Sequence, residues 1–143
     1  IENQIAIQQK WTVKRVIDPY DDADFQLIWE LKDLPARIPS KEPALLSTVE
    51  VVKVPEGHVI DIHLRSTFAR LGLICPSTTA DPGFEGNLTV EVYNASRHEI
   101  LVSPGDALFH CITKVCVGEP LYEGRYQGQS GITLPKALKS EGK

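Results

Sequence analysis

The feature that most constrains this chain is a series of short β-branched and apolar runs, each ended by Gly, Pro, Asn or Asp. Apolar residues at helical spacing are nearly absent. The runs fall at residues 5–7, 11–13, 25–31, 46–54, 59–64, 88–93, 100–102 and 108–117. Many short strands separated by turn residues are typical of a β-sandwich or a β-barrel. We therefore expect an all-β fold.

Three segments depart from this pattern. Residues 34–43 contain three prolines and predict a loop. Residues 66–71 predict a short helix with Ser66 as its N-cap. The C-terminal tail, residues 122–143, is rich in Gly, Gln and Ser and has few large apolar side chains. We expect this tail to be mobile unless a ligand orders it, and we expect residues 1–143 to form a single domain.

Charge and composition argue against several classes of partner. The net charge of −4 disfavours general electrostatic binding to nucleic acid or to an acidic membrane. No apolar run is long enough to span a bilayer. The three cysteines have no tight spacing, which favours a reducing compartment over a disulfide framework. We expect a cytoplasmic protein, and the absence of methionine even at position 1 leads us to expect a truncated or processed N-terminus.

The sequence lacks the pattern of a zinc deaminase. Such enzymes carry His-x-Glu and Pro-Cys-x-x-Cys, because zinc takes three protein ligands and leaves one position for water. The nearest residues are His98-Glu99 and Cys75-Pro76, which have the wrong order and spacing. We therefore expect no protein-bound metal site.

The segment Arg65-Ser66-Thr67-Phe68-Ala69-Arg70 lies at a predicted strand-to-helix junction. Backbone N–H groups at such a junction, together with hydroxyl and guanidinium groups, can bind an anion. An N-cap followed by two surface arginines would produce the same sequence. The residues alone leave both interpretations open.

Residues 88–93 alternate, so that Thr89, Glu91 and Tyr93 share one face of a predicted strand. Leu88, Val90 and Val92 share the other face. A carboxyl group held inside a barrel can shuttle protons. A solvent-facing strand residue is the commoner case, and spacing does not separate the two.

Three blocks between residues 64 and 134 carry a resemblance to a known family. Arg65-Ser66-Thr67-Phe68-Ala69-Arg70-Leu71-Gly72 is similar to R-S-S-L-A-R-L-G. The second block, Asp81-Pro82-Gly83-Phe84-Glu85-Gly86 and then Leu88-Thr89-Val90-Glu91, is similar to D-P-G-F-x-G followed by L-T-L-E. The third, Tyr122-Glu123-Gly124-Arg125-Tyr126-Gln127-Gly128-Gln129-Ser130-Gly131, is similar to the tail motif K-Y-Q-G-Q-x-G-P-T, with Gly131-Ile132-Thr133 in place of Gly-Pro-Thr. In this order the blocks resemble the dCTP deaminase branch of the trimeric dUTPase superfamily.

The resemblance implies a distorted jelly-roll subunit, a homotrimer with active sites at subunit interfaces, and metal-free deamination of dCTP to dUTP. A bifunctional member would continue to dUMP. Glu91 would act as general base and acid on a water that attacks C4 of cytosine. Ser66 would help to position that water, and Arg70 would balance charge and orient Glu91.

The resemblance also implies how a deoxypyrimidine nucleoside triphosphate is held. Arg65, Ser66 and Thr67 would contact the triphosphate, and Mg²⁺ would accompany the phosphates. The hairpin that ends in Ala80 and Asp81 would line the pyrimidine and deoxyribose pocket. The tail would close over the nucleotide through three residues, Tyr122, Arg125 and Gln129. Arg125 stands where the family often has Lys, which keeps the charge but changes the geometry.

Two alternatives stay open, one because Asp81 matches the position of the water-activating Asp of dUTPases and one because the chain departs from the family pattern before that residue. Thr78-Thr79-Ala80 runs directly into Asp81, where family members commonly carry a longer T-A-G-x-I segment. The first alternative is a dUTPase-like diphosphohydrolase with Asp81 as the base and magnesium on the phosphates. The second is a non-catalytic trimer that binds nucleotides. Loss of activity in Glu91→Gln would indicate the deaminase.

Overall fold

The computed structural model describes residues 1–8, 17–23, 29–118, 120–136 and 138. The predicted strand at residues 11–13 and the first part, residues 25–28, of the strand predicted at residues 25–31 lie outside this described part. The strands within it are β1 Gln4–Gln8, β2 Trp29–Asp33, β3 Ala36–Ile38, β4 Pro43–Lys53, β5 His58–Leu64, β6 Leu73–Ile74, β7 Thr78–Ala80, β8 Glu85–Asn94, β9 Ile100–Val102 and β10 Phe109–Val115. A short helix, α2 Ser66–Arg70, follows β5. The predicted all-β class is confirmed.

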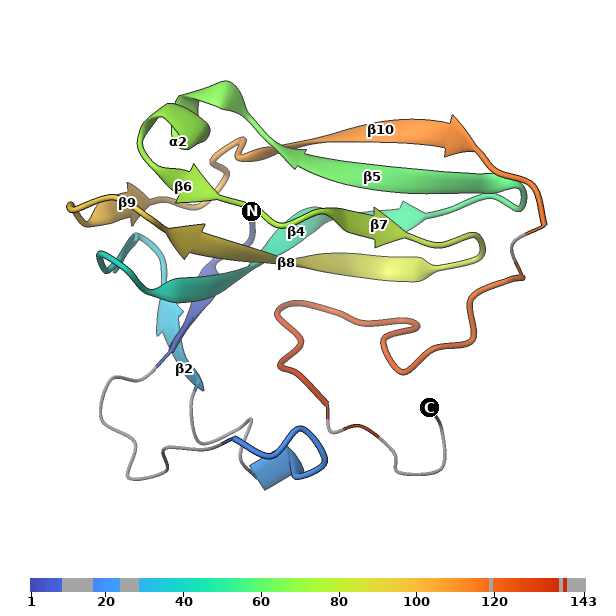
Figure 1. Ribbon diagram of the computed structural model, residues 1–143, viewed down its shortest axis with the longest axis horizontal. Coiled ribbons are helices and arrows are strands. Elements are labelled where there is room, and N and C mark those ends of the chain that lie inside the picture. The colour runs from blue at the N-terminus through green and yellow to red at the C-terminus, as the bar shows by residue number, and fades with distance from the viewer. Residues whose placement is uncertain (9–16, 24–28, 119, 137, 139–143) are drawn as a thin grey trace.

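The strands form antiparallel sheets in two layers (Figure 1). A five-stranded sheet has the order β2-β1-β4-β8-β6. A three-stranded sheet, β10-β5-β7, and a two-stranded sheet, β3-β9, lie against it. Apolar side chains between these layers exclude water, which supplies the main driving force for folding.

Two clusters of buried side chains make up the core. One joins the five-stranded sheet to β3 and β9, and its largest fully buried members include Ile5, Leu46 and Val102. The other joins β4 and β8 to β5 and β7 through Val54, Ile62, Ala80, Phe84, Leu88 and Val90. Both clusters depend on β8, whose residues 88, 90 and 92 are buried whereas residues 91 and 93 are exposed. The predicted alternation of β8 is therefore confirmed.

A buried asparagine closes the end of β8. The Asn94 side chain is fully buried and donates hydrogen bonds from Nδ2 to the carbonyl oxygens of Ile38 (3.0 Å) and His98 (2.7 Å). Its Oδ1 accepts from the Ser96 backbone N–H at 3.0 Å. Because every polar atom of this amide is used, its burial is compensated. The hydrogen bonds of the Asn94 side chain therefore fix the turn that is predicted after β8.

Two expectations about local structure are wrong. Residues 34–43 are not a loop throughout, because they contain β3, which pairs with β9. Pro35 and Pro39 flank that strand, where the missing N–H costs no ladder bond. The N-cap of α2 is Arg65, whose side chain makes no capping bond, and Ser66 is the first helical residue. Within the described residues, no helix has both the length and the apolar character needed to cross a membrane.

Candidate active site

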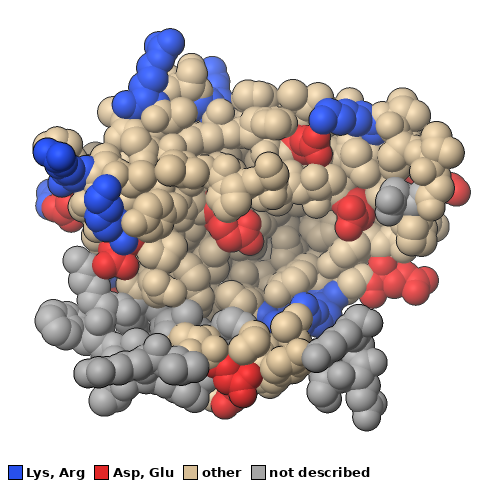
Figure 2. Space-filling view, viewed as in Figure 1, with Lys and Arg blue, Asp and Glu red and all other residues tan. Residues whose placement is uncertain are grey.

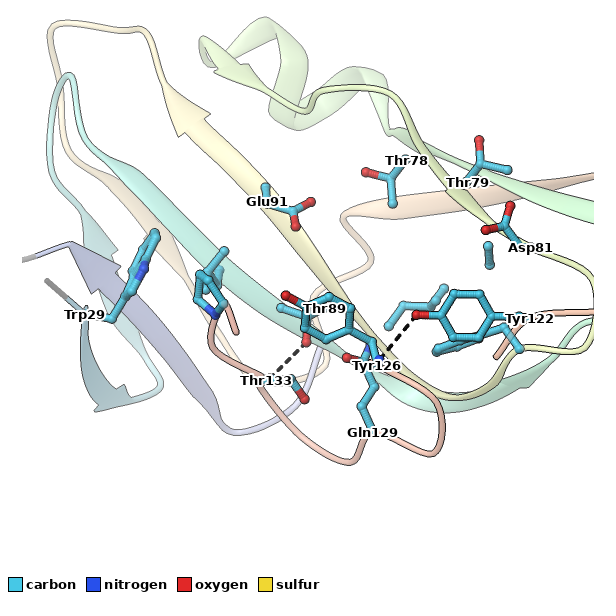
Figure 3. Close-up of a pocket in the computed structure, with 15 residues that line it drawn as sticks. Trp29, Thr78, Thr79, Asp81, Thr89, Glu91, Tyr122, Tyr126, Gln129 and Thr133 are labelled. Carbon is cyan, nitrogen blue, oxygen red and sulfur yellow. Dashed lines mark hydrogen bonds between the residues drawn. The ribbon is translucent and has the colours of Figure 1, made fainter. Parts of the chain in front are cut away.

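A pocket of about 330 Å³ lies between β7, β8 and a segment that we call the tail segment, residues 120–136 (Figure 3). The same face of the molecule is visibly hollowed, with acidic atoms on the rim of the hollow (Figure 2). The lining residues are Trp29, Leu45, Thr78, Thr79, Ala80, Asp81, Phe84, Leu88, Thr89, Glu91, Tyr122, Tyr126, Gln129, Thr133 and Pro135. A concave site with apolar walls and a few polar groups is the usual form of a small-molecule site.

Glu91 supplies the carboxylate in the middle of this pocket. It lies on β8 opposite Leu45 of β4 and on the face of β8 that does not enter the core. Thr89 shares this face because side chains two residues apart in a strand point the same way. Figure 3 shows the Glu91 carboxylate facing Thr78 across the cavity. A ligand in the pocket can therefore reach the carboxylate oxygens directly.

The thiol of Cys75 feels the charge of this carboxylate. Burial raises the pKa of the Cys75 thiol, and the negative charge of Glu91 raises it further. The thiol therefore remains protonated at neutral pH, whereas a nucleophilic cysteine needs a lowered pKa. Its sulfur donates to the Pro76 carbonyl at 3.4 Å. Cys75 is thus a packing residue, which lies against both core clusters.

The β7 strand forms the wall opposite Glu91 and is anchored to β5. Asp61 of β5 accepts a hydrogen bond from Thr79 Oγ1 at 2.9 Å and pairs with Lys114 of β10 at 2.6 Å. The hydrogen bond from Lys114 is the main reason that the pKa of Asp61 is lowered, and the bond from Thr79 adds to it. Ala80 and Asp81 follow directly and line the pocket. Asp61 therefore holds the wall in register across three strands.

The tail segment covers the first half of β8. The Gly128 N–H donates to the Glu85 carbonyl at 2.7 Å, and the Asn87 N–H donates to the Gln129 carbonyl at 2.9 Å. In turn, Gln129 Nε2 donates a hydrogen bond to the Asn87 carbonyl oxygen at 2.6 Å. These contacts place the Gln129 side chain at the pocket, as the sequence predicts.

Residues near both ends of the tail segment line the pocket and are fixed by contacts with β8 and the residues before it. Tyr122 packs edge-on against Phe84, with ring centroids 5.6 Å apart, and its hydroxyl accepts from the Tyr126 N–H at 3.2 Å. Further along, the Thr133 N–H donates to Thr89 Oγ1 at 3.0 Å. Figure 3 shows both bonds beneath the cavity. Side chains from the second and third motif blocks therefore meet in one site.

The structure gathers some of the predicted site residues and leaves others apart. Those that line the pocket are Ala80, Asp81, Glu91, Tyr122 and Gln129. Those that do not are Arg125 in the tail segment and the α2 group of Arg65, Ser66, Thr67 and Arg70. All four residues of the α2 group are exposed.

Sequence reasoning missed several lining residues. Thr89, Tyr126 and Thr133 stand at positions of the motif blocks, which is a signal that could have identified them. Trp29 and Pro135 carry no such signal. Trp29 reaches the pocket because β2 pairs with β1 beside β4, and no local pattern around residue 29 reveals that pairing.

Comparison with known proteins assigns the chain to a family. Residues 2–112 match the family model described as dCTP deaminase-like. The chain belongs to the dCTP deaminase-like family. The predicted resemblance is confirmed.

Two curated relatives of this dCTP deaminase-like chain are named dCTP deaminase. The protein from Caldivirga maquilingensis is 42% identical over 130 residues, which cover 89% of this chain and 73% of the relative. The protein from Pyrobaculum islandicum is 47% identical over 104 residues, which cover 73% of this chain and 59% of the relative. The chain thus spans little more than half the length of the second relative.

Solved structures agree with the fold of the dCTP deaminase-like chain. The 2′-deoxycytidine 5′-triphosphate deaminase of Agrobacterium tumefaciens superposes with a TM-score of 0.61 at 19% identity. The match covers 82% of this chain and 38% of that one. A dUTPase from phage phi11 of Staphylococcus aureus superposes with a TM-score of 0.51 at 19% identity, over 63% of this chain and 76% of that one. The predicted dUTPase-type fold is therefore confirmed.

Proposed function

We propose that this protein deaminates dCTP to dUTP and that Glu91 is its general base and acid. The observation that carries the proposal is the Glu91 carboxylate, which lies in a pocket built from the second and third motif blocks. The two relatives named dCTP deaminase, at 42% and 47% identity, support the substrate. Onward hydrolysis to dUMP is a further reaction that the same test measures.

The proposed reaction adds water to C4 of cytosine. Glu91 takes a proton from the water as the C4–O bond forms, and it delivers that proton to N3 of the ring. The second proton of the water moves to the amino nitrogen, the C4–N4 bond breaks, and ammonia leaves uracil behind. Once closed over the nucleotide, the tail segment would exclude bulk water from the pocket, which would strengthen the electrostatic influence of Glu91 on the reacting atoms.

The α2 residues enter this proposal through a neighbouring subunit. Arg65, Ser66, Thr67 and Arg70 are exposed and lie outside the pocket of their own chain. Leu71, at the end of α2, is 53% exposed, and an apolar pair on β6 and β8, Ile74 and Tyr93, is also exposed. Exposed apolar groups beside an incomplete site favour burial against another copy.

We therefore propose a homotrimer in which α2 of one subunit completes the pocket of the next. Arg65, Ser66 and Thr67 would bind the triphosphate, Ser66 would also position the water, and Arg70 would orient Glu91. From the tail segment, Tyr122, Arg125 and Gln129 would close over the nucleotide. The proposed partner set includes neither nucleic acid nor a membrane, and the proposed location is the cytoplasm.

Magnesium enters the proposal with the substrate. Among the described residues, no cluster of three or more His, Cys, Asp or Glu side chains is arranged to hold a metal ion. The phage phi11 dUTPase coordinates a structural Mg(II) ion. For this chain we propose Mg²⁺ on the nucleotide phosphates, where it would neutralise charge, and we assign it no protein ligand.

A second candidate is a dUTPase-like hydrolysis that uses Asp81. The observation that favours it is that Asp81 lines the same pocket as Glu91. There Asp81 would activate a water toward the phosphates. A nucleotide-binding trimer without turnover is the third possibility, motivated by the short β7 hairpin. The same incubations distinguish the three functions, because the deaminase gives product from dCTP, the dUTPase-like enzyme gives product from dUTP, and the binding protein gives none.

The test incubates the protein with dCTP and, separately, with dUTP, each with Mg²⁺, and separates the nucleotides by chromatography. We expect dUTP from dCTP, and we expect Glu91→Gln to lower that rate by about 10²–10⁴-fold. Glu56→Gln, which removes an exposed carboxylate in the turn before β5, is the matched control and should keep the wild-type rate.

Two outcomes would contradict the deaminase proposal. Product from dUTP alone, lost in Asp81→Asn and retained in Glu91→Gln, would assign the hydrolysis. Binding of dCTP without product from either nucleotide would assign a non-catalytic binding protein. Formation of dUMP from dCTP in the wild type would add the second activity to the first.

A further inference from the structure

The indole nitrogen of Trp29 is a buried donor that has no acceptor. Trp29 lines the pocket, and its Nε1 atom is the one buried side-chain nitrogen or oxygen, within the described part of the chain, that lacks a hydrogen-bond partner. Buried polar groups in folded proteins are nearly always paired. An unpaired N–H on a residue of the pocket wall therefore indicates an acceptor that arrives with a ligand.

The order of the strands places Trp29 at one end of the pocket. In the five-stranded sheet, β2 is the edge strand, and β1, β4 and β8 follow it. Glu91 lies on β8, whereas Asp81 follows β7 of the three-stranded sheet. Glu91 therefore stands between Trp29 at one end of the pocket and Asp81 at the other (Figure 3).

This order determines which edge of a bound pyrimidine would face Trp29. In the proposed reaction Glu91 acts at C4 and N3 of the base, and the resemblance implies that the sugar lies beside Ala80 and Asp81. The base would then extend from the sugar toward Trp29, because C4 lies across the ring from N1, the atom that carries the sugar. The substituent on C4 would be the part of the base nearest to the indole.

We propose that the indole N–H of Trp29 donates a hydrogen bond to the oxygen that deamination places on C4. This inference rests on the proposed function for the identity of the reaction. An indole N–H can only donate. The 4-amino group of dCTP is itself a donor, whereas the oxygen added from water, which becomes O4 of dUTP, is an acceptor.

The bond would therefore distinguish the transition state from the substrate. It forms only as the C4–O bond forms, and an interaction that is stronger in the transition state than in the ground state accelerates the chemical step. The same bond persists in the product, where O4 is a carbonyl oxygen. Trp29 is thus a specificity-determining residue, which favours oxygen over an amino group at C4.

The first test measures binding to Trp29→Phe, which keeps an aromatic ring and removes the N–H. Calorimetry uses dCTP, dUTP and 4-thio-dUTP, in the Glu91→Gln background so that dCTP persists. The sulfur of 4-thio-dUTP is a weak acceptor, which makes this nucleotide the control on the ligand side. We expect Trp29→Phe to weaken binding of dUTP by about tenfold. Binding of the other two nucleotides should change by less than about twofold.

The second test measures deamination with Glu91 intact. Trp29→Phe should lower kcat for dCTP by about tenfold and change KM by less than about twofold, because the substrate does not make the bond. Leu31→Ala is the control for a disturbance of β2. Leu31 is 49% exposed on the same strand and does not line the pocket, so this variant should keep the wild-type kcat.

Three results would overturn the inference. Unchanged affinity of Trp29→Phe for dUTP would exclude the bond to O4. An equal loss for all three nucleotides would show that Trp29 only forms the wall of the pocket. If Trp29→Phe does not fold, the comparison passes to the parent protein, in which equal affinities for dUTP and 4-thio-dUTP would exclude a donor at O4.

Failure of the deaminase proposal would give a different result. A Trp29-dependent preference for dUTP over 4-thio-dUTP, without deamination of dCTP, would leave the contact with O4 standing and remove the proposed reaction. Formation of dUTP at the wild-type rate by Trp29→Phe would support the deaminase and exclude a role of the indole N–H in the reaction.

Discussion

At the scale of single residues, Asp61 helps to position β7, the strand that forms the pocket wall opposite Glu91. It accepts from Thr79 and pairs with Lys114, so that one carboxylate joins β7, β5 and β10. Its side chain is 20% exposed, which leaves the pair partly screened by water. The Asp61–Lys114 pair thus contributes chiefly to the position of β7. Thr79 is hydrogen-bonded to Asp61 and directly precedes the lining residues Ala80 and Asp81.

We predict that Asp61→Asn lowers the melting temperature at pH 7 and that this difference from the wild type shrinks in acid. A carboxyl whose pKa is lowered by folding stabilises the protein above its ordinary value of 3.8, and the contribution is lost as the pH falls through the lowered pKa. Thermal unfolding from pH 7 to pH 3 measures the effect.

The partner of Asp61 supplies the control for this prediction. Lys114→Gln should lower the melting temperature by a similar amount. The double variant should lower it by less than the sum of the two single variants. Full additivity in this cycle would mean that the Asp61–Lys114 pair contributes no stability. A difference that grows as the pH falls would reverse the sign that the lowered pKa requires.

At the scale of elements, the docking of the tail segment on β8 depends on one glycine. Gly86 has a φ of +151°, and a Cβ placed there would lie 2.7 Å from the Gln129 carbonyl oxygen and 2.9 Å from its nitrogen. Those contacts are too short for any side chain. The tail segment therefore reaches β8 only because position 86 has no side chain.

We predict that Gly86→Ala displaces the tail segment and lowers deamination by about 10–100-fold, since a misplaced closing segment weakens alignment of the substrate. Hydrogen exchange at the Asn87 amide, which donates to Gln129, should accelerate in the variant. Gly105→Ala is the matched control, because Gly105 also has a positive φ, of +78°, but no atom lies within 4 Å of its Cβ position. Equal slowing in both variants would contradict a specific role for the contact.

At the scale of the whole molecule, one chain does not bring the predicted groups together. Glu91 lies in the pocket, whereas Arg70 lies on α2, outside it. The hypothesis of a shared site requires that the two residues come from different subunits of the homotrimer. A closed cyclic assembly repeats the same contact at every interface, so complementation between subunits is a direct consequence.

We predict that mixing two inactive variants restores activity. Glu91→Gln and Arg70→Ala should each be inactive alone. After joint refolding in equal amounts, random assembly should recover about a quarter of the wild-type activity, because one interface in four then receives both intact residues. A native mass of one subunit, or a trimer without recovery, would contradict the shared site.

The sequence by itself determined the features that depend on neighbours along the chain. The alternation of β8 places Glu91 on the face opposite Val90 and Val92 because strand side chains repeat with period two. The all-β class followed from the same local pattern. The third motif also identified Gln129, whose side chain lies at the pocket.

Only the tertiary structure decided the features that depend on distant pairing. The strand β3 forms in a proline-rich segment because β9, more than sixty residues later, supplies its partner. Trp29 reaches the pocket through the pairing of β2 with β1, and Lys136 reaches Tyr126 because the tail segment folds back on itself. Hydrogen bonding between segments far apart in the chain leaves no periodic signal in either segment. The local sequence therefore predicts which face of a strand is buried, but it does not predict which strand pairs with it.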